Sequence, residues 1–124
     1  MLTLTSQLQR RLSPTRKREN TVQKEDVINT AFEIVAYSGD ARSNLLLALN
    51  KAQAGKFDEV DALVEEAKKS LADAHRAQTT MLTSEARGEN VDITFITVHA
   101  QDHLMTTLLL KDIIGTLLDV YRRN

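Results

Sequence analysis

The C-terminal segment, residues 92–123, constrains the fold most because it is apolar on almost every side of a helix. Two stripes run along it at steps of three and four residues. The first stripe consists of Ile96, Ala100, His103, Thr107, Leu110, Ile114, Leu117 and Tyr121. The second stripe consists of Phe95, His99, Asp102, Thr106, Leu109, Ile113, Thr116 and Val120. A helix that is apolar nearly all round must be buried nearly all round.

The rest of the chain predicts two more helices. Along residues 25–53 one face carries Ile28, Ala31, Val35, Ser38, Arg42, Leu45, Leu49 and Ala52, and along 57–86 one face carries Val60, Val64, Ala67, Leu71, Ala74, Gln78 and Met81. Ser38-Gly39-Asp40 predicts a kink or an end inside the first helix, and turns are expected at Gly55 and at residues 87–90. Two helices cannot enclose a third on every side. We therefore expect an all-α chain of three antiparallel helices that self-associates with the third helix at the centre.

Composition excludes several classes of protein. The 124 residues include no cysteine, which rules out disulfides, thiolate metal sites and a cysteine nucleophile. The net charge of −1 indicates neither a nucleic-acid nor an anionic membrane partner. No apolar run approaches the roughly 18–20 residues of a membrane span, and no secretory signal is recognisable. We expect one cytoplasmic domain without direct membrane insertion.

The charge is divided unevenly along the chain. Residues 1–24 carry six basic side chains and one acidic side chain, whereas residues 25–124 carry ten and sixteen. Such a segment is typical of a flexible, solvated extension, and docking to an acidic partner is the alternative. We therefore predict a basic N-terminal extension over residues 1–24 and a helical domain over residues 25–124.

Three ionisable side chains interrupt the apolar C-terminal segment. His99, Asp102 and His103 fall within about one helical turn, on adjoining faces. A buried carboxylate is costly unless it meets a cation or several hydrogen-bond donors. If Asp102 lies on a symmetry axis, its copies would repel one another, and a metal ion or shared protons would relieve the repulsion.

Two chemistries suit this cluster, and a structural role is a third interpretation. A neutral imidazole can accept a phosphoryl group, with Gln101 and His103 donating hydrogen bonds to the phosphoryl oxygens. Alternatively, His99-x-x-Asp102-His103 approximates the H-x-x-E-H motif of a zinc hydrolase, although with the shorter acid. Finally, both histidines could simply be hydrogen-bonded inside a helical interaction module that has no chemistry.

Four landmarks resemble a known family. They are Ser38-Gly39-Asp40-Ala41-Arg42-Ser43, Ala54-Gly55-Lys56-Phe57, Ala74-His75-Arg76-Ala77-Gln78-Thr79 and Val98-His99-Ala100-Gln101-Asp102-His103-Leu104-Met105. In this order, over about residues 25–121, the chain resembles the lactose/cellobiose (diacetylchitobiose) type enzyme IIA component of the bacterial phosphoenolpyruvate-dependent sugar phosphotransferase system. The basic extension departs from the family, whose members commonly begin near the first helix.

The resemblance implies a phosphotransferase component that forms a homotrimer with the third helices central. His99 matches the phosphohistidine, which would be loaded by the phosphocarrier HPr. It would then pass the phosphoryl group to a cysteine of the cognate IIB component, which phosphorylates a disaccharide of the lactose, cellobiose or chitobiose type during uptake through the IIC permease.

The resemblance also implies roles for neighbouring residues. Asp102 matches an aspartate whose three copies hold one structural Mg²⁺ on the threefold axis, in agreement with the preference of hard cations for oxygen ligands. Gln101 and His103 match neighbours of the phosphohistidine, and His75 is a further residue that could face the site. Asp40, Arg42 and Ser43 are interpreted as structural residues at the break in the first helix.

Overall fold

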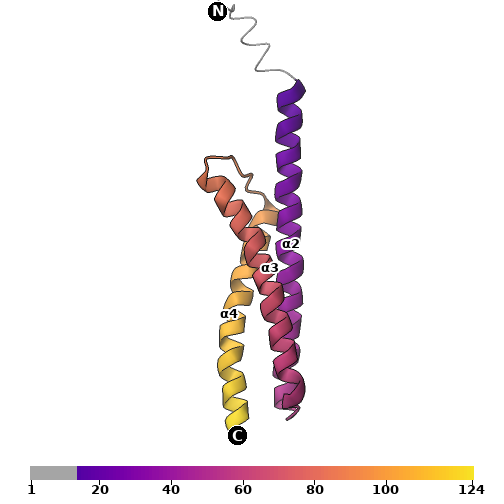
Figure 1. Ribbon diagram of the computed structural model, residues 1–124, viewed down its shortest axis with the longest axis vertical. Helices are drawn as coiled ribbons and strands as arrows, with labels where there is room; N and C mark the ends of the chain where they lie inside the picture. Colours follow the sequence, from indigo (N-terminus) through magenta and orange to yellow (C-terminus); the bar gives the residue numbers. More distant parts are fainter. Residues whose placement is uncertain (1–13) are drawn as a thin grey trace, which may run out of the picture.

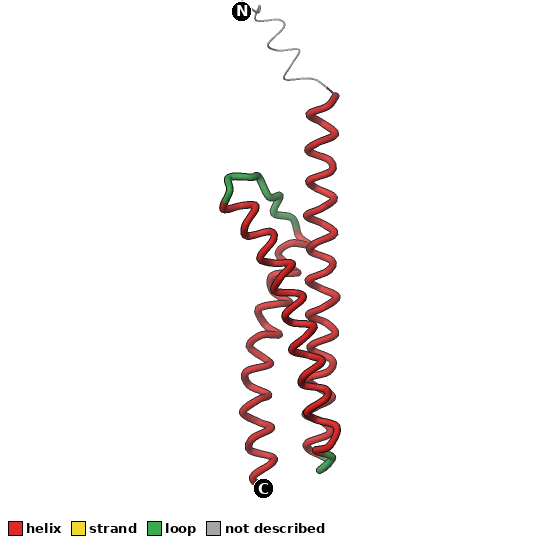
Figure 2. The backbone as a smooth tube through the Cα atoms, viewed as in Figure 1, coloured by secondary structure: helices red, strands yellow, loops and turns green. Residues whose placement is uncertain are grey.

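The computed structural model describes the backbone of residues 14–124 and the side chains of residues 24–124. Three long helices make up this part of the chain: α2 (Pro14–Gln53), α3 (Val60–Ala86) and α4 (Phe95–Arg123). A short 3-10 helix, η1 (Phe57–Glu59), precedes α3, and the described residues contain no strand. The turn after α2 lies at one end of the molecule, and the loop after α3 lies at the other end of α3, beside α2 and partway along it (Figures 1 and 2). The predicted all-α fold is confirmed.

Glycine and threonine set the helix boundaries. Gly55 and Gly88 have φ angles of +77° and +83°, the left-handed conformation that ends helices and that glycine adopts without strain. The N–H of Gly55 donates to the carbonyl of Ala52 at 3.0 Å, and the N–H of Gly88 donates to the carbonyl of Glu85 at 3.0 Å. At the start of α4, the N–H of Thr94 donates to Oγ1 of Thr97 at 2.8 Å. Both turns therefore fall where the sequence predicted them.

The first helix begins earlier than predicted. It starts at Pro14, where a proline suits the first helical position because it has no N–H to leave unpaired, and not near Glu25. Residues 14–24 of the predicted basic extension therefore have helical backbone, and this part of α2 projects beyond the other helices (Figure 1). Residues 1–13 of that extension lie outside the described residues.

Neither the end nor the kink predicted at Ser38-Gly39-Asp40 is present, because α2 is one helix across these residues and runs straight in Figure 1. Its buried stripe passes through them at steps of three and four residues and consists of Ala31, Ile34, Ser38, Ala41, Leu45, Ala48 and Ala52. Arg42, predicted to face inward, is exposed, and Ala41 takes the inner position. Tertiary packing on this stripe outweighs the weak helix propensity of a single glycine.

Helices α3 and α4 both pack along α2 but contact each other little. The predicted stripe of α3 is confirmed, since each of its seven residues is buried or half-buried. The first stripe of α4 faces the core, with Ala100, Thr107 and Ile114 buried. None of the described helices is long and apolar enough to cross a membrane.

The second stripe of α4 is exposed along its whole length. We call the surface centred on it the outer face of α4, made up of Phe95, Val98, Asp102, Met105, Leu109, Ile113 and Val120. Phe95 is 90% exposed and Leu109 is 60% exposed, which is unusual for large apolar side chains. Repeated exposure of apolar residues along one helix marks an interaction surface.

Candidate functional site

The two histidines of α4 lie side by side. Residues four apart share a helix face, and the ring centroids of His99 and His103 are 5.2 Å apart with planes tilted by 34°. His99 is exposed, whereas His103 is half-buried and lies against α2. The hydroxyl of Thr107 donates to the carbonyl of His103 at 2.7 Å. The accessible imidazole is therefore that of His99, and His103 lies beside it on the interior side.

Gly39 of α2 supplies the surface against which His103 lies. If a Cβ atom were added to Gly39, the one described atom outside the adjoining stretch of α2 within 4 Å of it would be Nε2 of His103, at 3.9 Å. The backbone of α2 therefore comes close to the imidazole without an intervening side chain. The sequence pattern indicated a structural role for Gly39, but as a residue that interrupts the first helix.

Asp102 occupies the outer face of α4, between Val98 and Met105. Its side chain is exposed, and no group of three or more His, Asp or Glu side chains that could hold a metal ion occurs within residues 24–124. Within the described residues of one chain, Asp102 is therefore not part of a cluster that could hold a metal ion. The zinc-hydrolase hypothesis has two adjacent imidazoles and no third ligand in the described chain.

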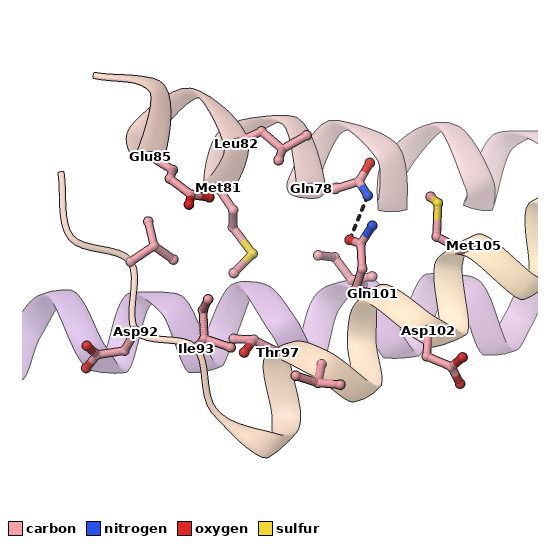
Figure 3. Close-up of a pocket in the computed structure, with 13 residues that line it drawn as sticks. Gln78, Met81, Leu82, Glu85, Asp92, Ile93, Thr97, Gln101, Asp102 and Met105 are labelled. Atoms are coloured by element: carbon pink, nitrogen blue, oxygen red, sulfur yellow. Dashed lines mark hydrogen bonds between the residues drawn. The ribbon is translucent and has the colours of Figure 1, made fainter. Parts of the chain in front are cut away.

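Gln101 lies on the side of α4 that faces away from His99. It lines a cavity of about 550 Å³ between α3, α4 and the loop that joins them, together with Asp102 and mostly apolar side chains (Figure 3). Nε2 of Gln78 on α3 donates to Oε1 of Gln101 at 2.7 Å. His99 does not line this cavity, since residues two apart on a helix point about 200° apart. Within one chain, Gln101 and His99 are therefore not brought together.

Other predicted residues lie away from this cluster. His75 is exposed on α3, its carbonyl accepts a hydrogen bond from Thr79 Oγ1 at 2.9 Å, and no hydrogen bond in the described chain joins it to α4. Asp40, Arg42 and Ser43 are exposed on α2. Since α2 has no break, their predicted role at that break is wrong.

Gln78 is the residue of this region that sequence reasoning assigned no role. It is a polar side chain in an otherwise apolar stripe, and it is only 6% exposed. A buried amide in such a stripe indicates a hydrogen-bond partner. That signal was present in the sequence, although the identity of the partner was not.

Comparison with known proteins agrees with the resemblance seen in the sequence. The family model described as "PTS system, Lactose/Cellobiose specific IIA subunit" matches residues 29–122. The lactose-specific EIIA component of Streptococcus mutans is 49% identical over 103 residues, which cover 83% of this chain and 99% of that protein. The corresponding protein of Staphylococcus aureus is 51% identical over 103 residues, covering 83% of this chain and 100% of its own length.

Solved structures give the same assignment. The cellobiose-specific enzyme IIA of Bacillus anthracis superposes with a TM-score of 0.75 at 38% identity, covering 77% of this chain and 87% of that one. The chitobiose IIA of Escherichia coli, solved in complex with HPr, superposes with a TM-score of 0.68 at 30% identity, covering 78% and 94%. The chain therefore belongs to the lactose/cellobiose-specific IIA family of the sugar phosphotransferase system.

Proposed function

We propose that this chain carries a phosphoryl group on His99 between phospho-HPr and a cysteine of its cognate IIB component. IIB would use the group to phosphorylate a disaccharide of the lactose, cellobiose or chitobiose type that enters through the IIC permease. The observation that carries the proposal is the exposed imidazole of His99 beside His103, in a chain of the IIA family. The Escherichia coli relative solved with HPr supports HPr as the donor.

The reaction needs an accessible ring nitrogen with a free lone pair. That nitrogen of His99 attacks the phosphorus of phospho-HPr in line, and the N–P bond to the histidine of HPr breaks as the new N–P bond forms. In the second step the thiolate of IIB attacks the same phosphorus, an S–P bond forms, and His99 regains its lone pair. In one chain His99 is exposed, as access by both partner proteins in turn requires.

His103 stabilises the phosphoryl group from the same chain. Its ring lies next to that of His99, with the ring centroids 5.2 Å apart. An N–H of His103 can therefore donate a hydrogen bond to an oxygen of the phosphoryl group on His99. Hydrogen-bond donors aimed at the equatorial oxygens stabilise the charge that develops during phosphoryl transfer. His103 therefore acts as a donor and His99 as the acceptor.

Three chains pack as a homotrimer through the outer face of α4, with the three helices of each chain antiparallel. This arrangement covers apolar side chains such as Leu109 and Ile113, which one chain leaves 60% and 49% exposed. His99 and Gln101 flank Asp102 on opposite sides of α4, so that around a threefold axis His99 of one copy faces Gln101 of the next. The acceptor site is then completed by a neighbouring copy.

Asp102 would hold a magnesium ion on the threefold axis. Its exposed carboxylate lies on the outer face of α4, and three such carboxylates give the oxygen donor set that a hard cation prefers. The ion supplies positive charge that offsets the mutual repulsion of the three carboxylates. We assign it a structural role.

Phosphoryl labelling tests the function directly. With phosphoenolpyruvate, enzyme I and HPr, the chain should gain one acid-labile phosphate, measured by intact-protein mass spectrometry at neutral and at acid pH. His99→Ala should abolish the gain, and the matched variant His75→Ala should retain it. Labelling of His99→Ala to the wild-type extent would place the acceptor elsewhere and contradict the proposal.

A further inference from the structure

Gln78 lies where an apolar side chain would be expected. It occupies one position of the buried stripe of α3, between Ala74 and Met81, and is only 6% exposed. Burying an amide is unfavourable unless it is hydrogen-bonded, and a leucine or methionine would fill a similar volume without this cost. The glutamine therefore needs an explanation beyond packing.

The hydrogen bond of Gln78 has a defined direction. Nε2 of Gln78 donates to Oε1 of Gln101 at 2.7 Å, across the gap between α3 and α4 (Figure 3). These two helices otherwise contact each other little, so the bond is a rare link between them. An amide whose oxygen is engaged in this way keeps its NH₂ group free to donate to another acceptor.

We propose that Gln78 is a positioning residue that fixes the orientation of the Gln101 amide. With its oxygen held by Gln78, Gln101 offers N–H donors, and not a repelling carbonyl oxygen, to the phosphoryl group on His99 of a neighbouring copy. This inference rests on the proposed function and deepens it, because it explains why a polar side chain is retained inside the α3 stripe. Gln78 does not itself touch the phosphoryl group.

Gln78→Glu tests the orientation by changing pH. Burial raises the pKa of the introduced carboxyl, and its protonated form still donates to Oε1 of Gln101. The ionised form can only accept, so it turns the Gln101 amide and directs the carbonyl oxygen at the phosphoryl group. Relative to wild type, transfer from phospho-HPr should therefore be near normal at about pH 5.5 and slowed about 10- to 100-fold at about pH 8.5.

Both transfer rates are measured on the same variant, Gln78→Glu. Circular dichroism at both pH values verifies that this variant is folded. Quenched-flow labelling at each pH measures the rate. A ratio of variant to wild-type rate that stays constant across this pH range, with the fold intact, would overturn the proposal.

A double-mutant cycle tests whether Gln78 acts through Gln101. Gln78→Leu and Gln101→Ala should each slow transfer, and the double variant should be no slower than Gln101→Ala alone. If the rate reductions of the two single variants multiply in the double variant, Gln78 acts independently of Gln101. That result would contradict the proposal. If wild-type protein gains no phosphate on His99, the proposed function fails, whereas normal wild-type labelling with unaffected Gln78 variants overturns this inference alone.

Gln53→Leu is the matched control. Nε2 of Gln53 donates to the hydroxyl of Tyr121 at 3.2 Å, so this substitution also removes a glutamine hydrogen bond between two helices. It does so at the C-terminal end of α4, far from His99 along that helix. Its transfer rate should equal that of wild type.

Discussion

A methyl group on Gly39 would lie 3.9 Å from Nε2 of His103, the one described atom outside the adjoining part of α2 that it would contact. The glycine lies in the middle of α2 with an ordinary helical backbone, so that a left-handed conformation does not explain it. His103 in turn lies beside His99, with ring centroids 5.2 Å apart. The surface of α2 at Gly39 therefore limits where the second imidazole can lie.

Substitutions of Gly39 should separate helix stability from imidazole position. Gly39→Ala places a methyl group in ordinary contact and should increase the free energy of unfolding by roughly 0.5–1 kcal/mol, because glycine loses more backbone entropy on folding. Gly39→Leu extends into the space of the His103 ring and should displace it. Thermal denaturation measures the first effect, and ¹⁵N chemical shifts of the imidazole nitrogens measure the second.

The control for added bulk is Ala36→Leu, at an exposed position of the same helix. It should leave the imidazole shifts unchanged. Wild-type shifts in Gly39→Leu would show that this glycine does not position His103.

Ser38 offers a test of a buried polar atom. Its side chain is fully buried and its hydroxyl has no hydrogen-bond partner among the described residues. Leaving a buried hydroxyl unpaired costs about 1–3 kcal/mol, so Ser38→Ala should raise the free energy of unfolding by about 1 kcal/mol. Urea denaturation measures the change. A loss of stability would show that the hydroxyl finds a partner, such as a bound water or another chain.

The sequence predicted α3 better than α2, and the reason lies in packing. Helix α3 buries one narrow stripe, so a single repeat from Val60 to Met81 describes it. Helix α2 is covered by both α3 and α4, and every second buried position lies one residue before the predicted one, as with Ala41 in place of Arg42, while the positions between them are as predicted. When a helix packs against two other helices, the periodicity of its apolar residues does not specify which of two adjacent residues is buried.

Within the candidate site, only the relationships between residues of the same helix could be predicted from the sequence. The adjacency of His99 and His103 follows from their spacing on one helix, and the structure confirms it. The bond between Gln78 and Gln101 joins residues on different helices, so it depends on how α3 and α4 are placed on α2. The position of Gly39 opposite His103 depends on tertiary structure in the same way.

A charge on the outer face of α4 should prevent assembly without unfolding the chain. Leu109 is 60% exposed in one chain, so Leu109→Lys leaves the chain's own core intact. In the proposed trimer the same lysine would be buried among apolar side chains, which is strongly unfavourable. Light scattering should change from about 42 kDa, three chains of 13.9 kDa, to a single chain.

Thr80→Lys, at an exposed position of α3, is the control for the added charge. It should retain the mass of the wild type. A trimeric Leu109→Lys variant would place the contact surface elsewhere than the outer face of α4.

Asp102→Leu should separate the role of the ion from that of the apolar surface. The substitution removes the carboxylate that we assign to magnesium and extends the apolar outer face of α4, between Val98 and Met105. Apolar side chains in place of buried charges avoid both repulsion and desolvation. We therefore expect loss of bound magnesium, measured by elemental analysis, and a trimer that is as stable as wild type or more so on thermal denaturation.

Chelation of wild-type protein gives the complementary measurement. Without the ion, the three carboxylates of Asp102 repel one another, so chelator should lower the melting temperature of the wild type and leave that of Asp102→Leu unchanged. A monomeric Asp102→Leu variant would mean that the ion holds the chains together. In that case the apolar side chains on the outer face of α4, such as Leu109 and Ile113, would be insufficient for assembly, and their exposure in one chain would need another partner.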